Sequence, residues 1–89
     1  MLPLGIINER MASLKGWGLE GDSIVKDFIF ESHRKAMEFA NKVSELAEKN
    51  NHHPTMIIGY KDVRLLLTTH YEKGLTSKDF ELAEEIDGI

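Results

Sequence analysis

The amino-acid sequence predicts an α+β fold in which three helices pack on one face of a four-stranded antiparallel sheet. Three segments place apolar residues at helical spacing, and two pairs of short segments between them are rich in β-branched, aromatic or alternating apolar residues. Short strands that follow each other closely pair in antiparallel fashion, and amphipathic helices cover one face of such a sheet. The predicted order is therefore helix, strand, strand, helix, strand, strand, helix (α-β-β-α-β-β-α).

The first third of the chain predicts a short helix and a hairpin. A helix over residues 6–15 is indicated by three apolar residues at helical spacing, Ile7, Met11 and Leu14. Gly16 ends this helix. The segments 17–19 and 24–30 are expected to pair across a turn at residues 20–22, because the longer segment is rich in β-branched and aromatic side chains.

The clearest predicted element is a long helix that begins after Ser32 and ends near residues 50–51. The Ser32 hydroxyl is a good acceptor for the free N–H groups of a first helical turn. Six apolar residues then form one stripe at the spacing of a helix face: Ala36, Phe39, Ala40, Val43, Leu46 and Ala47. Pro54 disfavours helical backbone at the residue before it, so the chain is expected to be extended there.

The last third predicts two strands and a final helix. Residues 55–60 and 63–70 are the strands, joined by a turn at 61–62 and followed by a break at Gly74. The segment Thr76–Asp79 is a variant of the capping box, whose acidic residue also suits the positive end of the helix dipole. The apolar face of the helix that follows consists of Phe80, Leu82, Ala83 and Ile86.

Length and composition narrow the class of protein. The 89 residues are expected to form a single domain over residues 1–89, because no length remains for a second core. The sequence contains no cysteine, which excludes disulfides, thiolate catalysis and cysteine-based metal sites. Small domains without disulfides often gain stability by oligomerisation, so a homo-oligomer is expected.

The charge pattern and the N-terminal residues bear on partners and location. The formal net charge is −4 and the basic residues are scattered, which argues against direct binding of nucleic acid. Residues 1–7 lack the basic start of a signal peptide, and no apolar run approaches the roughly 20 residues that span a bilayer. The sequence therefore predicts a cytoplasmic protein with no membrane partner.

Three of the four histidines lie at two places suited to acid–base chemistry. His52 and His53 precede Pro54 in a helix-to-strand loop, and His70 ends a predicted strand. Imidazole titrates near neutrality, so it both donates and accepts protons at cellular pH. Strand alternation places His70 opposite the regular apolar row of its strand, beside a turn where a cleft can open. The fourth, His33, is expected to be a solvated bystander.

Three interpretations of these histidines are open. The first is purely structural, since most histidines in proteins catalyse nothing. The second is a zinc site made of His52, His70 and Glu48, but extended backbone points His52 and His53 to opposite sides and no HExxH helix is present. The third is proton transfer without metal, with His52 and His70 on either side of a flat polar ligand and Glu48 orienting an imidazole or binding a ring N–H. The residue types favour the third.

A longer pattern surrounds the histidines. Its members are Glu48, His52-His53-Pro54, Tyr60, Val63, Leu65, Leu67, Thr69-His70, Gly74-Leu75-Thr76 and Asp79. Upstream it continues in Gly16-Trp17, Ile24, Lys26, Phe28, Phe30, Ala36, Phe39, Val43 and Ala47. This pattern resembles the signature of the pterin-4a-carbinolamine dehydratases, a family also known as the dimerisation cofactor of a homeodomain transcription factor. The resemblance covers nearly the whole chain from Leu14 onwards.

The resemblance implies a fold, an activity and roles for residues. The family's fold has helices on one face of a four-stranded antiparallel sheet, and its members act as dimers or tetramers. They dehydrate the 4a-hydroxytetrahydropterin left by aromatic amino acid hydroxylases to quinonoid dihydropterin and water, without a metal or organic cofactor. His52 and His70 correspond to the acid/base groups, and His53 to a residue that binds and positions the pterin. The supporting residues are Glu48, Pro54, Thr69 and Asp79.

Two departures from the family pattern and one alternative function accompany this prediction. Met56 stands where many members have an aromatic residue, so one wall of a pterin pocket is expected to be softer. Asn51 stands where the familiar animal members have Asp. A non-catalytic protein-interaction module on the same fold is the alternative function, because a fold does not determine a function. A hydroxylase of the same pathway is an expected partner of the enzyme.

Overall fold

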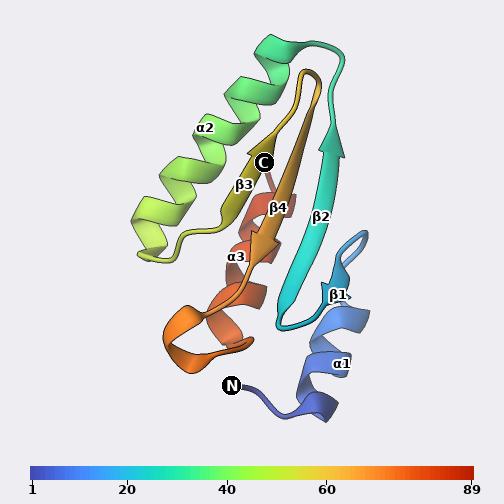
Figure 1. Ribbon diagram of the computed structural model, residues 1–89, viewed down its shortest axis with the longest axis vertical. Helices are drawn as coiled ribbons and strands as arrows, with labels where there is room; N and C mark the ends of the chain where they lie inside the picture. The colour runs from blue at the N-terminus through green and yellow to red at the C-terminus, as the bar shows by residue number, and fades with distance from the viewer.

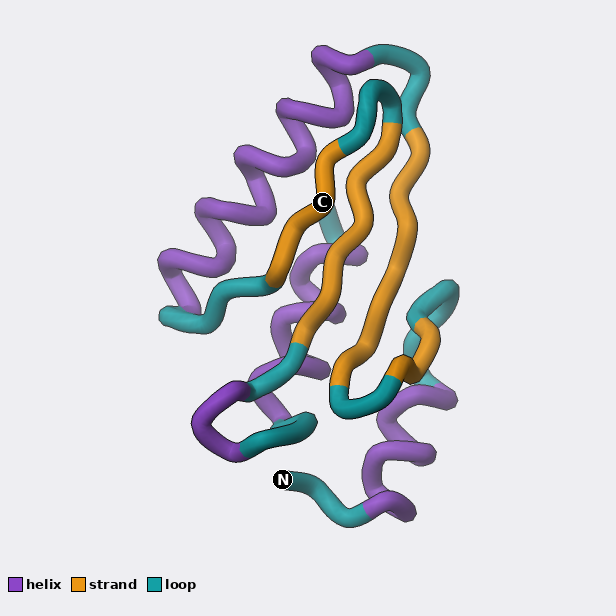
Figure 2. The backbone as a smooth tube through the Cα atoms, in the orientation of Figure 1, coloured by secondary structure: helices purple, strands orange, loops and turns teal.

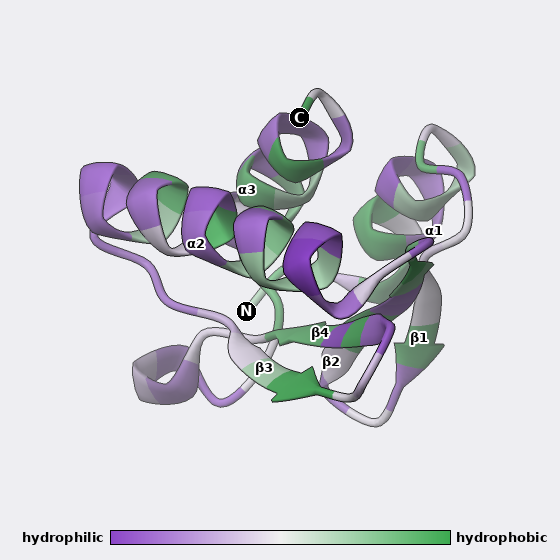
Figure 3. Ribbon diagram, turned by 90° about the horizontal axis from the view of Figure 1, so that it is seen from above, coloured by the Kyte–Doolittle hydropathy of each residue, from purple (hydrophilic) through white to green (hydrophobic).

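The computed structural model describes all 89 residues, and its elements follow the predicted order (Figure 1). They are α1 (Leu4–Ala12), β1 (Gly18–Glu20), β2 (Ser23–Ile29), α2 (His33–Asn50), β3 (Thr55–Ile58), β4 (Asp62–Leu67), the 3-10 turn η1 (His70–Glu72) and α3 (Ser77–Asp87). The strands form one antiparallel sheet in the order β1-β2-β4-β3 (Figure 2). The three helices lie on the same face of this sheet (Figure 3), so the predicted α+β fold is confirmed.

The strands β2 and β4 form the centre of the sheet. Their antiparallel register runs from the pair Ile24–Leu67 to the pair Ile29–Asp62. Successive side chains of a strand point to opposite faces, so every second residue of β4 from Val63 to Leu67 points toward the helices. These β4 side chains are fully buried and form the floor of a hydrophobic cluster of 15 buried residues.

The long helix α2 covers the sheet with the stripe that its sequence predicts. The N–H of Lys35 donates to the Ser32 hydroxyl at 3.2 Å, which confirms the predicted cap. The ring centroid of Phe39 lies 4.6 Å from that of Phe28 and 5.1 Å from that of Phe30, so aromatic contacts join helix and sheet. The buried residues of α2 are Ala36, Phe39, Ala40, Val43 and Ala47. None of the helices is both long and apolar enough to cross a bilayer.

The end of α2 directs the chain toward the candidate site. Asn51 adopts left-handed backbone with φ 49°, a conformation that asparagine tolerates better than most residues. The N–H of His52 still donates to the carbonyl of Ala47 at 3.1 Å, and from Pro54 the chain is extended into β3. The sharp turn at Asn51 therefore sets the direction in which the two consecutive histidines leave the helix.

The boundaries of α1 and β3 differ from the prediction for local reasons. The helix α1 covers Leu4–Ala12 rather than 6–15, because Pro3 suits the position before a helix and its carbonyl accepts the N–H of Ile7 at 3.0 Å. The strand β3 ends at Ile58 rather than at residue 60, since the N–H of Gly59 bonds to the carbonyl of Asp62 at 2.8 Å. This bond closes the hairpin earlier than the apolar pattern indicates.

The strand β4 also ends early, and this changes the setting of His70. The N–H of Thr69 donates to the carbonyl of Gly74 at 3.2 Å, and the N–H of Gly74 donates back to Thr69 at 3.4 Å. These bonds close a small loop, and His70 begins the turn η1 inside it. The prediction that His70 lies in the strand, on a face defined by strand alternation, is therefore wrong, while its place beside a turn is confirmed.

Candidate active site

A buried histidine–carboxylate pair lies where the loop after α2 meets the start of α3. The Nε2 atom of His52 is 2.6 Å from Oδ1 of Asp79. The residue His52 is 8% exposed and Asp79 is fully buried. Because the pair is shielded from water, its hydrogen bond is stronger than the same contact on the surface.

The second carboxylate oxygen of Asp79 is held by two further donors. The hydroxyl of Thr69 donates to Oδ2 at 2.8 Å, and the N–H of Thr76 donates to it at 3.0 Å. The hydroxyls of Thr69 and Thr76 also lie 2.8 Å apart. The carboxylate is thus fixed by bonds on both oxygens, and no buried side-chain nitrogen or oxygen of the chain lacks a partner.

This arrangement determines which ring nitrogen of His52 is free. A carboxylate only accepts hydrogen bonds, so in the neutral imidazole Nε2 carries the hydrogen and Nδ1 carries the lone pair. Nδ1 makes no hydrogen bond within the chain, and since no fully buried polar side-chain atom is unpartnered, Nδ1 is not fully buried. Such an imidazole is oriented by one nitrogen and presents the other as a proton acceptor, which is the arrangement of a general base.

The Asp79 carboxylate also connects the residue before His70 to the site around His52. Thr69 bonds to Asp79 and is followed immediately by His70, whose side chain is exposed. One buried network therefore joins the loop that contains His52 to the turn that contains His70, although 27 residues separate His52 from Asp79. The imidazole of His70 is thus exposed to solvent next to this network.

His53 and Glu48 form a separate, exposed pair. The Nε2 atom of His53 contacts Oε2 of Glu48, one turn back on α2. The neighbouring histidines therefore point to different surroundings, His52 into the protein and His53 outward, as extended backbone predicts. Glu48 does orient an imidazole, and that imidazole belongs to His53. Pro54 is half-buried beside them.

The ligands of the zinc alternative are not brought together. His52 binds Asp79 and Glu48 binds His53, so the set of His52, His70 and Glu48 does not converge. No group of three or more His, Cys, Asp or Glu side chains of the chain is arranged to hold a metal ion.

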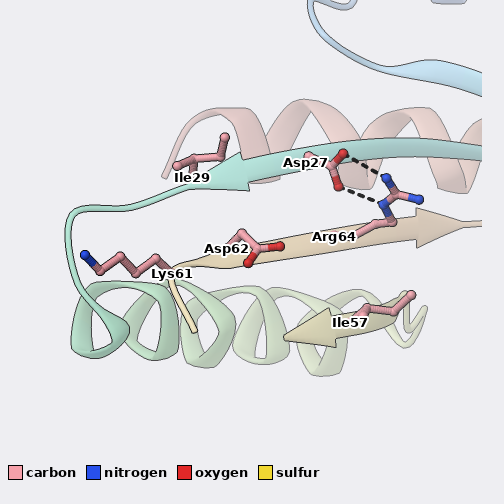
Figure 4. Close-up of a pocket in the computed structure, with 6 residues that line it drawn as sticks. All are labelled: Asp27, Ile29, Ile57, Lys61, Asp62 and Arg64. Carbon is pink, nitrogen blue, oxygen red and sulfur yellow. Dashed lines mark hydrogen bonds and ion pairs between the residues drawn. The ribbon is translucent and has the colours of Figure 1, made fainter. Parts of the chain in front are cut away.

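The hollows of the single chain lie away from the histidines. None of the five is lined by His52, His53 or His70. The largest, about 520 Å³, lies on the open face of the sheet beside the ion pair of Asp27 and Arg64 (Figure 4). Within one chain, the histidines thus line no closed pocket, although His52 itself is buried and His53 and His70 are exposed.

Thr76 takes part in the site in a way that the sequence did not predict. Thr76 was predicted as a helix cap alone, yet its N–H and hydroxyl belong to the network around Asp79. The capping-box spacing was the available signal, because a carboxylate that caps a helix beside a histidine can also orient it. His33, the expected bystander, is exposed and bonds through Nδ1 to the carbonyl of Tyr60 at 2.9 Å.

Comparison with known families gives a clear result for this fold and this set of residues. The model of the family described as pterin 4 alpha carbinolamine dehydratase matches residues 5–89. The chain belongs to the pterin-4a-carbinolamine dehydratase family. The resemblance inferred from the sequence is confirmed, and with it the assignment to the hydro-lyases, since pterin-4a-carbinolamine dehydratases eliminate water.

Individual relatives agree with the family. A protein of Thermomicrobium roseum named for pterin-4-alpha-carbinolamine dehydratase is 43% identical over 80 residues, which cover 90% of this chain and 86% of the relative. A crystal structure of a transcriptional coactivator/pterin dehydratase from Brucella melitensis superposes with a TM-score of 0.93 at 31% identity, covering 98% of this chain and 95% of that chain. The predicted fold of the pterin-4a-carbinolamine dehydratases is thereby confirmed.

A more distant structure shares the fold alone. It is a pterin dehydratase-like protein identified as a RuBisCO assembly factor in the alpha-carboxysome. Its TM-score is 0.67 at 19% identity, over 81% of this chain and 83% of that chain. The fold of the pterin-4a-carbinolamine dehydratases is thus also found in a protein that is described as an assembly factor.

Proposed function

We propose that the chain converts 4a-hydroxytetrahydropterin to quinonoid dihydropterin and water by acid–base catalysis with His52 and His70. The observation that supports this most directly is the contact of His52 with the buried carboxylate of Asp79. It leaves Nδ1 of His52 without a hydrogen-bond partner in the chain and joins the same network to Thr69, the residue before His70.

The proposed reaction needs one proton removed and one delivered. A base takes the hydrogen from N5 of the pterin, and the electron pair forms the double bond from N5 to C4a. The bond from C4a to the hydroxyl oxygen breaks, and an acid protonates that oxygen to give water. No electrons are exchanged with a second reactant. Each positioned acid or base is worth about 10²–10⁴ in rate.

The two imidazoles suit different halves of this reaction. We assign the base to His52, because Asp79 stabilises the imidazolium that forms when Nδ1 takes a proton. His70 is exposed and makes no side-chain hydrogen bond, so as an imidazolium it is free to donate to the leaving oxygen. Imidazoles near opposite faces of the ring would serve both stereoisomers of the carbinolamine.

Other residues support the site without reacting. His53, oriented by Glu48, is proposed to bind and position the pterin from the outer side, and Pro54 keeps the backbone between them extended. Asp79 and Thr69 are proposed to act through His52 and His70 as positioning residues. No metal or organic cofactor takes part in the proposed reaction.

The proposed enzyme works as a homo-oligomer in the cytoplasm, next to an aromatic amino acid hydroxylase that supplies its substrate. No hollow of the single chain is lined by these histidines, so a neighbouring chain is a natural source of the missing pocket wall. Sedimentation analysis should give a mass well above the 10.1 kDa of one chain. A monomer at micromolar concentration would contradict the proposed assembly.

A stopped-flow assay of carbinolamine breakdown tests the reaction. The protein should accelerate breakdown above the rate in buffer, and His52→Ala or His70→Ala should each lower turnover about 10²–10⁴-fold. His33→Ala is the matched control, since this histidine is bonded to the Tyr60 carbonyl outside the site. Turnover should persist in the presence of a chelator. Normal rates in both site variants would refute the assignment.

The alternative function is a protein-interaction module. One observation favours this alternative: the similar structure from Brucella melitensis is described as a transcriptional coactivator as well as a pterin dehydratase. Titration with a pterin separates the two functions, because a module that only binds proteins has no reason to bind pterin saturably. Saturable binding that is lost in His53→Ala supports the enzyme, and absence of any binding supports the module.

A further inference from the structure

The turn that contains His70 is a small loop held at its base. Thr69 and Gly74 close it through two backbone hydrogen bonds of 3.2 and 3.4 Å. The four residues between them, 70–73, are all exposed, and Lys73 adopts left-handed backbone with φ 54°. Inside the loop, the N–H of Glu72 donates to the Thr69 carbonyl and the N–H of Lys73 donates to the His70 carbonyl, both at 3.1 Å, so the loop is a compact unit. The tilt of this unit relative to α3, and with it the direction of the His70 side chain, depends on contacts outside these bonds.

Tyr71 makes that contact. Its hydroxyl accepts a hydrogen bond from Nζ of Lys78 at 3.0 Å, which is the only side-chain hydrogen bond made by residues 70–73. Lys78 lies in the first turn of α3, and by donating to Tyr71 its ammonium keeps a pKa above the usual lysine value. The contact is therefore intact throughout the neutral pH range.

The sequence positions of these residues explain why the contact between Tyr71 and Lys78 affects His70. Thr69 and Tyr71 lie on either side of His70, and their partners Asp79 and Lys78 are adjacent in α3. One bond lies on the buried side of the loop and the other on its exposed side. Two such bonds to one helix restrain rotation of the turn, and the exposed ion pair of Glu72 with the N-terminal ammonium adds a longer contact of 3.8 Å.

We propose that Tyr71 and Lys78 are positioning residues that hold His70 in its catalytic orientation. This inference rests on the proposed function of His70. The two residues act through His70, and neither is assigned a contact with the pterin. Because both side chains lie at the surface, their removal should leave the fold intact, and the effect should fall on turnover.

Single variants test the size of the effect. Tyr71→Phe removes the hydroxyl and Lys78→Met removes the donor, so each should lower kcat about 3–10-fold, the effect of one lost surface hydrogen bond, with KM nearly unchanged. Lys78→Arg keeps a donor and should restore most of the wild-type kcat. Lys61→Met is the matched control, because the Lys61 ammonium lies 5.3 Å from the ring centroid of Tyr60 in a similar exposed pair, at the other end of β4 from His70.

A double variant separates positioning from direct binding. In a His70→Ala background, Tyr71→Phe and Lys78→Met should have no further effect on turnover, because the side chain that they position is gone. An additional loss in that background, or a rise in KM in the single variants, would show direct contact with the substrate and overturn the proposal.

Nuclear magnetic resonance keeps the test independent of the proposed reaction. The Hε1 signal of His70 should shift or broaden in Tyr71→Phe, while the signals of His53 and His33 stay in place. An unchanged His70 signal would overturn the positioning role whether or not the protein is a dehydratase. A changed signal in a protein without dehydratase activity would refute the proposed function and leave the positioning of His70 standing.

Discussion

The Nε2 atom of His52 lies 2.6 Å from Oδ1 of Asp79, and both side chains are shielded from water. The contact joins the loop after α2 to the first turn of α3, and through Thr69 it reaches the turn before His70. The residues proposed to react and the residues that stabilise this corner of the fold are therefore partly the same. Stability and activity should respond differently at the two proposed catalytic histidines.

Replacing His52 should destabilise the protein, whereas replacing His70 should not. His52→Ala leaves an oxygen of the buried Asp79 carboxylate without a partner, so we expect the free energy of unfolding to fall by about 1–3 kcal/mol. His70→Ala removes an exposed side chain and should change the free energy of unfolding by less than about 0.5 kcal/mol. Urea denaturation measures both, and equal losses would contradict the network described around Asp79.

Asp79→Asn tests whether the carboxylate selects the ring nitrogen of His52. The amide has one acceptor and one donor, so it cannot accept from both His52 and the N–H of Thr76. Turnover should fall about 10²–10⁴-fold, because an imidazole in the wrong tautomer cannot accept a proton at Nδ1.

The control for this variant is Asp87→Asn at the end of the same helix. Asp87 also accepts two side-chain bonds, from Nε1 of Trp17 at 2.9 Å and from Nζ of Lys26 at 2.9 Å. It should lose stability without losing turnover per folded molecule. Comparable turnover losses in both variants would assign the effect of Asp79→Asn to the fold rather than to the tautomer.

Local patterns predicted most of the fold. The apolar stripe of α2, the Ser32 cap and the capping box at Thr76 each depend on residues within two turns of each other, and all three are present. The end of β4 was missed because the β-branched residues Thr68 and Thr69 favour a strand and continue the side-chain alternation past Leu67. What ends the strand is the bridge from Thr69 to Gly74, which is not visible in that alternation.

The candidate site was predictable only in part. The motif identified His52 and His70, but their separate surroundings depend on partners that are distant in sequence. Asp79 lies 27 residues from His52, and no periodicity of the chain connects them. The sequence therefore supplied the residue types, and the packing of α3 against the loop after α2 supplied the contacts on which their proposed roles rest.

Leu65→Ala measures how much the centre of the sheet contributes to the stability of the fold. The Leu65 side chain is fully buried in β4, so its loss should lower the free energy of unfolding by about 2–5 kcal/mol. Leu4→Ala makes the same chemical change at a side chain that is 67% exposed and should cost less than about 1 kcal/mol. Thermal and urea denaturation of the pair check the difference, and similar losses would contradict the assigned core.

The ion pair on the open face of the sheet should make stability depend on pH at the acid end. Arg64 donates from Nε to Oδ1 of Asp27 at 2.8 Å and from Nη2 to Oδ2 at 3.1 Å (Figure 4). These bonds, and the guanidinium charge, hold the pKa of Asp27 below its usual value of 3.8. A depressed pKa in the folded state adds stability above the unfolded value, and this contribution is lost as the pH falls through the folded value.

Arg64→Gln should therefore raise the titration midpoint of the Asp27 carboxyl toward 3.8. The stability difference between wild type and variant should be constant above about pH 5 and shrink below pH 4, because a protonated carboxyl no longer binds the guanidinium as an ion pair. Carbon-detected titration of the Asp27 carboxyl measures the midpoint directly. Lys35→Gln, which breaks the exposed pair of Lys35 with Glu31, is the matched control and should leave the Asp27 midpoint unchanged. A wild-type midpoint at or above 3.8 would mean that the two-pronged bond does not persist in solution.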